Sequence, residues 1–286
     1  MMMKRLLPLG VLCCAAWSAS PAAAIEIGFE AFEGYVLGPL SPPSGPTQQG
    51  WSGGAQAGFT NNDPGDEQVI DSEAFSGSNS WHYARGYGSS GPGTPFSPVM
   101  GGVSGPGTSF DFSIHFKAAS ASGDGSEQNL YMGTAAGNDR TGFNIYLENN
   151  SAGDGLHLYT FDWISGASSK QILATQLDRS TWHEVTVNAV FAADPLDDVF
   201  EYSIDGNLVY TGNSWPNPWR VSMGFATVYG DSIKFSDGGG DTLLHEGFYY
   251  DTLLYSFAAV PEPATGALFL LALTGLSTQR RSQTAH

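Results

Sequence analysis

Two acidic side chains, Asp71 and Glu73, stand two residues apart in the segment Asp71-Ser72-Glu73. Residues i and i+2 of a β-strand lie on the same face of a sheet, which brings their carboxyl groups close together. A retaining glycosidase needs two carboxyl groups roughly 5–5.5 Å apart, one of them a nucleophile. The pair therefore has the residue types of such a site. The alternative is an exposed strand end before a turn at Gly77.

A second group of reactive side chains follows at His82, Tyr83 and Arg85. A polysaccharide lyase would need these residue types to converge on one groove. Adjacent positions of a strand point to opposite faces, so we expect His82 and Tyr83 to be separated and His82 to be a surface or edge residue. The sequence has no Gly-x-Ser-x-Gly elbow and no His-Glu-x-x-His pair. Enzymatic activity is left open but unsupported.

Aromatic and polar side chains at outward positions suit a sugar, whose ring presents flat C–H faces and many hydroxyl groups. We expect the outward positions of successive strands to line one concave surface: His115, Asn144, Tyr146, Glu148, Trp182 and Asn188. Further tryptophans stand at a strand end and in the proline-containing loop 213–220. Packing of that loop onto the edge of the fold is the alternative, because tryptophan is mostly buried. The predicted carbohydrate-binding residues are Tyr146, Glu148, Trp163, Trp215 and Trp219.

An acidic turn is the candidate metal site. Asp194, Asp197 and Asp198 bring three carboxylates into one loop, and calcium prefers oxygen ligands from flexible loops. The glycine-rich turn from Asp237 to Asp241 is a weaker second candidate. Calcium is thus the cofactor to consider, and solvated turn chemistry is the alternative.

Alternation of apolar and polar residues predicts β-strands through most of residues 25–259. Apolar stripes occupy one face of 110–116, 143–147, 185–191 and 200–204, and Asp205-Gly206 marks a hairpin that returns through 208–210. Residues 156–163 are apolar on both faces, as expected of a central strand, and 221–229 and 248–257 complete the set. We therefore predict an all-β fold, a two-sheet antiparallel sandwich forming one domain over 25–259.

The amino-terminal segment 1–24 has the pattern of a secretory signal peptide. Lys4 and Arg5 precede an apolar stretch over 6–17, and Ala22-Ala23-Ala24 supplies small residues for cleavage. We expect a signal helix there, with cleavage after Ala24. Both cysteines, Cys13 and Cys14, lie in this segment, so the processed protein would contain no disulfide and no cysteine-bound metal.

The carboxy-terminal segment 260–286 combines a short motif, an apolar run and a basic end: Val260, Pro261, Glu262 and Pro263, then 264–276, then Arg280 and Arg281. Spanning a bilayer core takes roughly 17–25 apolar residues. Counted through Gln279, the run comes near that minimum. We expect a short hydrophobic helix that anchors the chain transiently through 264–279, with the arginines on the cytoplasmic side.

The charge of the predicted body excludes one class of partner. The chain has 28 acidic and 11 basic residues, and the body 25–259 retains 27 and 7 of them, a formal charge of −20. Nucleic-acid binding requires clustered lysine and arginine. A nucleic acid is therefore not an expected partner, whereas self-repulsion would keep an exported protein soluble.

The tail resembles the PEP-CTERM sorting signal of Gram-negative bacteria, on the strength of the Pro-Glu-Pro motif, the short apolar segment and Arg280-Arg281. That resemblance implies processing by an exosortase after passage through the secretion translocon. The body resembles the laminin-G and concanavalin A-like jelly roll in the strand 182–187, the hairpin 202–209 and the late strand 249–254. Glucanase-like members of that family carry Glu-x-Asp-x-x-Glu, of which only Asp71-Ser72-Glu73 is present here.

Together these patterns predict an exported protein, passing through the inner membrane to the cell surface or extracellular matrix. Its jelly-roll domain is expected to bind carbohydrate or exopolysaccharide. The alternatives are a glycosidase or lyase that cleaves polysaccharide, and a purely structural matrix or envelope protein.

Overall fold

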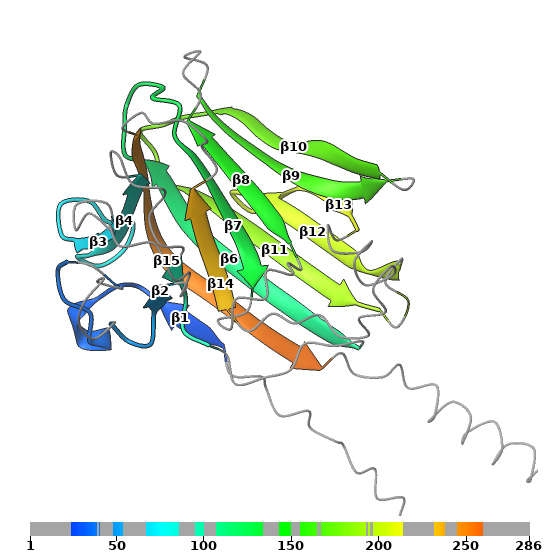
Figure 1. Ribbon diagram of the computed structural model, residues 1–286, viewed down its shortest axis with the longest axis horizontal. Helices are drawn as coiled ribbons and strands as arrows, with labels where there is room; N and C mark the ends of the chain where they lie inside the picture. Colours follow the sequence, from blue (N-terminus) through cyan, green and yellow to red (C-terminus); the bar gives the residue numbers. More distant parts are fainter. Residues whose placement is uncertain are drawn as a thin grey trace, which may run out of the picture.

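The computed structural model describes residues 24–38, 40, 48–53, 67–85, 95–99, 107–133, 143–149, 155–164, 167–192, 194, 197–213, 232–237 and 245–259. Its strands form two antiparallel sheets, and the predicted jelly-roll sandwich is confirmed (Figure 1). The expected signal helix and the sorting segment 260–286 lie outside the described residues, as does the expected strand 221–229. In the part of the chain that is described, no helix is both long and apolar enough to cross a bilayer.

The larger sheet has eight strands among the described residues and is called the large sheet. Its order is β13 (Asn207–Gly212), β12 (Val199–Ile204), β11 (His183–Phe191), β6 (Thr108–Ala118), β15 (His245–Ala259), β4 (Ser80–Arg85) and β3 (Glu67–Ile70). β1 (Ile25–Ile27) pairs with β15 beside this path, and a short 3-10 helix (Ala31–Glu33) follows it.

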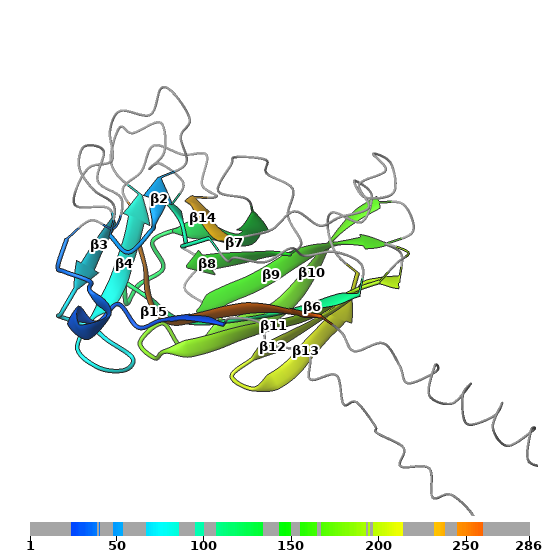
Figure 2. The ribbon, with the colours of Figure 1, turned by 90° about the horizontal axis from the view of Figure 1, so that it is seen from below.

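The second sheet has seven strands in the described ranges and is called the small sheet. Its order is β10 (Ala167–Leu177), β9 (Leu156–Ile164), β8 (Asn144–Asn149), β7 (Glu127–Gly133), β14 (Ser232–Asp237), β5 (Pro95–Phe96) and β2 (Ser52–Gly53). Figure 2 shows the two sheets as stacked layers, with β15, β6 and β11 below β7, β8 and β9.

The core lies between the two layers, as the apolar stripes predict. Phe110, Phe112, Ile114 and Phe116 of β6 are all buried, whereas the residues between them are not. The same alternation buries one side of β8, β9 and β11, including Ile145, Leu147, Leu158, Val185 and Val187. Burial of such stripes against each other holds the sheets together, because removing apolar surface from water is the main driving force of folding.

The strand predicted over residues 156–163 is β9, which is an interior strand of the small sheet. It lies between β8 and the edge strand β10. Leu156 and Leu158 face the core, while the alternate residues Tyr159 and Phe161 form a ring cluster on the outside. The outer face of β9 is apolar because of this aromatic cluster.

Candidate functional site

The register of the small sheet gathers polar and aromatic side chains on its outer face. Asn129 of β7 is opposite Tyr146 of β8, which is opposite Tyr159 of β9. Two residues along, Glu127 is opposite Glu148, which is opposite His157. The intervening residues, such as Leu130, Leu147 and Leu158, are buried, so these two rows must point away from the core. We call the set the small-sheet face: Glu127, Asn129, Tyr146, Glu148, His157, Tyr159, Phe161 and Lys170.

The aromatic rings of the small-sheet face pack against one another. Tyr146 and Tyr159 stack with centroids 4.7 Å apart and planes 2° apart. Lys170 of β10 places its Nζ 3.4 Å from the centroid of Tyr159. Because β8 and β10 are on opposite sides of β9, the ring of Tyr159 is covered on both sides, and only 6% of the residue is exposed.

Phe161 closes this cluster at right angles. Its ring meets Tyr146 at a centroid distance of 5.4 Å and 86°, and Tyr159 at 5.8 Å and 87°. Edge-to-face contacts of this kind are favourable for aromatic pairs. The tyrosines therefore form a rigid packed block.

Two carboxylates flank the tyrosine block. Glu127 and Glu148 are direct cross-strand partners, a position in which Cβ atoms are about 4.5–5.5 Å apart and like charges repel. Burial raises the pKa of the Tyr159 hydroxyl, and the charges of Glu127 and Glu148 and the hydrogen bond with Glu127 raise it further. Burial and then Glu127 also raise the pKa of Tyr146. The tyrosines thus remain protonated beside two carboxylate acceptors.

The structure brings only part of the predicted site together. Tyr146 and Glu148 lie on the small-sheet face. Trp163 lies near the end of β9, its backbone opposite Ser168, and its side chain is outside the described residues. Trp215 and Trp219 also lie outside them.

The single concave surface expected from six outward residues is wrong. His115 belongs to β6, Asn188 to β11, and Trp182 directly precedes β11, all in the large sheet. Asn144, Tyr146 and Glu148 belong to β8 of the small sheet. Outward residues of the two sheets face opposite sides of the sandwich, because both sheets turn their apolar stripes inward.

Six residues of the small-sheet face were not predicted: Glu127, Asn129, His157, Tyr159, Phe161 and Lys170. β7 alternates Glu127, Asn129 and Tyr131 with Gln128, Leu130 and Met132, a pattern that would have revealed it. In β9 the aromatic outer side hid the alternation. Their convergence depends on strand register, which period-two alternation alone does not specify.

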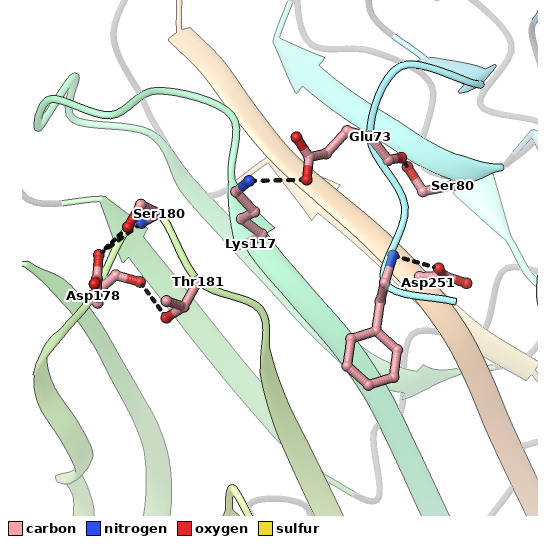
Figure 3. Close-up of polar contacts among 8 residues, drawn as sticks. Glu73, Ser80, Lys117, Asp178, Ser180, Thr181 and Asp251 are labelled. Carbon is pink, nitrogen blue, oxygen red and sulfur yellow. Dashed lines mark hydrogen bonds and ion pairs between the residues drawn. The ribbon is translucent and has the colours of Figure 1, made fainter. Parts of the chain in front are cut away.

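The proposed acidic pair after β3 does not have the expected geometry. β3 ends at Ile70, so Asp71 and Glu73 do not share a strand. The carboxylate of Glu73 lies 2.9 Å from the Lys117 ammonium group (Figure 3). The glycosidase interpretation required two carboxyl groups on one face of a strand. Here Glu73 is in an ion pair and neither acidic residue belongs to β3, so that arrangement is missing.

The separation expected within the second reactive group is confirmed. Tyr83 is fully buried in the core, and His82 is half-buried on the other side of β4. The Nε2–H of His82 donates to the carbonyl of Glu246 at 2.6 Å. The side chain of Arg85 lies outside the described residues.

The candidate calcium ligands have different surroundings. Asp194 and Asp197 are exposed, whereas Asp198 is only 1% exposed and accepts the backbone N–H of Ala192 at 2.8 Å. Among the described residues, no three His, Cys, Asp or Glu side chains come together as a metal site. Calcium binding by this loop stays a prediction.

Comparison with known proteins identifies no family. No protein-family profile matches the chain, and no curated protein matches it. Among solved structures, an endo-1,3-beta-glucanase from Streptomyces sioyaensis is similar at 12% identity and a TM-score of 0.44, covering 78% of this chain and 89% of that one. Beta-agarase A is similar at 13% identity and a TM-score of 0.41, covering 73% and 82%. A family-7 polysaccharide lyase, alginate lyase A1-II', is similar at 11% identity and a TM-score of 0.40, covering 75% of this chain and 86% of that one.

Proposed function

We propose that the sandwich binds carbohydrate through the small-sheet face. The observation that carries the proposal is the direct opposition of Glu127 and Glu148 beside the stacked Tyr146 and Tyr159. Facing carboxylates repel each other, and hydrogen-bond donors of a bound sugar would offset that repulsion. Carboxylate oxygens accept, and tyrosine hydroxyls donate, the hydrogen bonds that sugar hydroxyls form.

Lys170 extends the proposed site toward β10. Its side chain is exposed, and its ammonium group lies over the Tyr159 ring. Lysine provides up to three donors beside the carboxylate acceptors. The face thus offers donors and acceptors on a rigid support, which reduces the entropy lost on binding.

The test is binding of the full chain to a glycan array, followed by calorimetry with the best oligosaccharide. Glu148→Gln keeps the side-chain shape and removes the charge, so we expect the affinity to fall at least tenfold. Glu201→Gln is the matched control, since Glu201 is an exposed strand glutamate of the large sheet. Absence of glycan binding, or equal affinities for Glu148→Gln and the control, would contradict the proposal and favour a purely structural matrix protein.

A polysaccharide-cleaving enzyme is the second candidate, because two opposed carboxyl groups are also the basic equipment of a glycosidase. Release of reducing ends from polysaccharides by the full chain measures it directly. Loss of that release in both Glu127→Gln and Glu148→Gln would favour cleavage, and no release from any polysaccharide would leave binding alone.

We further propose that the chain is exported, with residues 1–24 removed and the segment 260–286 recognised by an exosortase-type enzyme. The predicted arrangement of Pro261, Glu262 and Pro263 before an apolar run supports this proposal. Cell fractionation and intact-mass measurement test it. Alanine at these three positions should leave the protein in the inner membrane with its tail uncleaved, and an unprocessed cytosolic chain would contradict export.

A further inference from the structure

The loop between β3 and β4 crosses the outer face of the large sheet and covers two neighbouring positions of β6. The carboxylate of Glu73 meets Lys117 at 2.9 Å. The ring of Phe75 stacks on His115 with centroids 3.7 Å apart and planes 16° apart. His115 and Lys117 are successive outward residues of β6, so the loop runs along this strand for at least two side-chain positions (Figure 3).

A buried carboxylate holds Phe75 in place. Asp251 of β15 is fully buried, and its Oδ2 accepts the backbone N–H groups of Phe75 at 2.9 Å and Ser76 at 3.0 Å. The other oxygen accepts the N–H of Thr252 at 2.6 Å. Hydrogen bonds to a charged acceptor are roughly twice as strong as neutral ones. The aromatic ring is therefore positioned before any ligand arrives.

The far end of the loop is also fixed. The Oε1 atom of Glu30 accepts the backbone N–H groups of Ser78 at 2.6 Å and Asn79 at 3.0 Å. The Ser80 hydroxyl donates to the carbonyl of Glu73. Anchored at both ends, the segment 73–79 forms a rigid rim on the sheet.

One face of the Phe75 ring remains available. Although the other face rests on His115, Phe75 is 47% exposed. Trp182 stands edge-on to it, at a centroid distance of 6.1 Å and an angle of 63°. Among the described residues, the buried Nδ1 of His115 and Nε1 of Trp182 have no hydrogen-bond partner. In native structures an unsatisfied buried polar atom calls for an explanation.

Charged groups lie beside this ring. The side chains of Lys117 and Glu73 are 18% and 31% exposed, and Tyr249 is opposite Lys117 on the same face. An aromatic face with a donor and an acceptor next to it matches a pyranose ring, which has an apolar C–H side and hydroxyl groups around its edge. A membrane or an apolar peptide would not use the Glu73 carboxylate.

We propose that Phe75, Trp182, Glu73 and Lys117 form a second saccharide-binding site, in which a sugar ring stacks on the exposed face of Phe75. This site shares with the proposed function only the class of ligand, since its residues are on the other sheet. β6, which carries Lys117, and the strands β8 and β9 of the small-sheet face belong to opposite layers of the sandwich (Figure 2). One chain would thus hold two polysaccharide strands at once and cross-link them.

The test compares Phe75→Ala with Phe32→Ala in the full chain. Phe32 is 87% exposed and lies in the short helix after β1, so it controls for loss of an exposed phenylalanine. Calorimetry uses linear hexasaccharides of β-1,3-glucan, β-1,4-glucan and mannuronate. We expect two sites in the wild type and in Phe32→Ala, and one in Phe75→Ala. Phe75→Trp should keep both, and a thermal melt verifies that each variant is folded.

A second measurement follows cross-linking as the increase in viscosity of the parent polysaccharide. Wild type should raise the viscosity, and both Phe75→Ala and Glu148→Gln should fail to do so. If Phe75→Ala still bound at two sites, or raised the viscosity as much as the wild type, the second site would be overturned and the small-sheet face would be unaffected. Conversely, binding that survives Glu148→Gln but is lost in Phe75→Ala would overturn the small-sheet proposal and retain this one. No binding by the wild type overturns both.

Discussion

The Tyr250 hydroxyl of the large sheet donates a hydrogen bond to Oε1 of Gln128 in the small sheet at 2.5 Å. Both residues are buried, and the Gln128 Nε2 group donates in turn to the carbonyl of Tyr83 at 2.6 Å. This bridge crosses the interior between the two sheets, where a polar group without a partner is costly. It therefore fixes how the two sheets sit on each other.

Tyr250→Phe removes the donor and leaves Oε1 of Gln128 buried without it. We expect the free energy of unfolding in urea to fall by about 1–3 kcal/mol. Tyr249→Phe, on the outer face of the same strand, is the control and should change stability little. Equal losses in the two variants would show that the bridge contributes nothing specific.

Glu148→Gln should stabilise the fold while it weakens glycan binding. Removing one of two opposed charges relieves repulsion with Glu127, and we expect a gain of about 0.2–1 kcal/mol in the free energy of unfolding. Urea titrations at low and moderate salt measure this gain, which should shrink as salt screens the charges. A loss of stability would mean that Glu148 has a structural role.

Gly155→Ala should be far more damaging than Gly206→Ala. Both glycines have positive φ, +104 and +75, so both substitutions strain the backbone. At Gly155 a Cβ would also come within 2.7 Å of the Gln176 Cα and the Leu177 carbonyl, whereas at Gly206 nothing lies within 4 Å. Differential scanning calorimetry should show a melting temperature several degrees lower for Gly155→Ala, and equal values would refute the steric explanation.

The stability of the sandwich should decline in mild acid because of His82. Burial lowers the pKa of its imidazole, against the opposing hydrogen bond to Glu246. Below the ordinary histidine pKa of about 6.5 the unfolded chain takes up a proton that the folded chain does not. Above that pH the imidazole of His82 is neutral in both states and does not lower stability. As the pH drops from there toward the lowered pKa, protonation of the unfolded chain reduces the free energy of unfolding.

Unfolding of the wild type and His82→Gln at pH 7.5, 6.5 and 5.5 measures this effect. We expect the wild type to lose stability relative to His82→Gln by up to about 1.4 kcal/mol per pH unit. Parallel curves for the two proteins would contradict the assignment. His115, whose pKa burial also lowers, remains in both proteins and cancels from the comparison.

The alternation of apolar and polar residues determined the fold class and most strands. The stripe from Phe110 to Phe116 has a period of two, and only a sheet with one buried face places all four residues in a core. Asp205-Gly206 likewise determined a hairpin, and both residues adopt positive φ, 51 and 75. These features are local, so the chain encodes them without reference to distant partners.

The sites depend on contacts that are distant in sequence. Glu127 becomes the partner of Glu148 only through the register of β7 and β8. The backbone of Phe75, whose ring stacks on His115, is held by Asp251, 176 residues away. The prediction that His115 and Tyr146 share one surface was wrong. Alternation shows that a residue faces outward but does not show which sheet carries it. Strand pairing and sheet stacking decide that assignment, because they are set by the packing of the whole core.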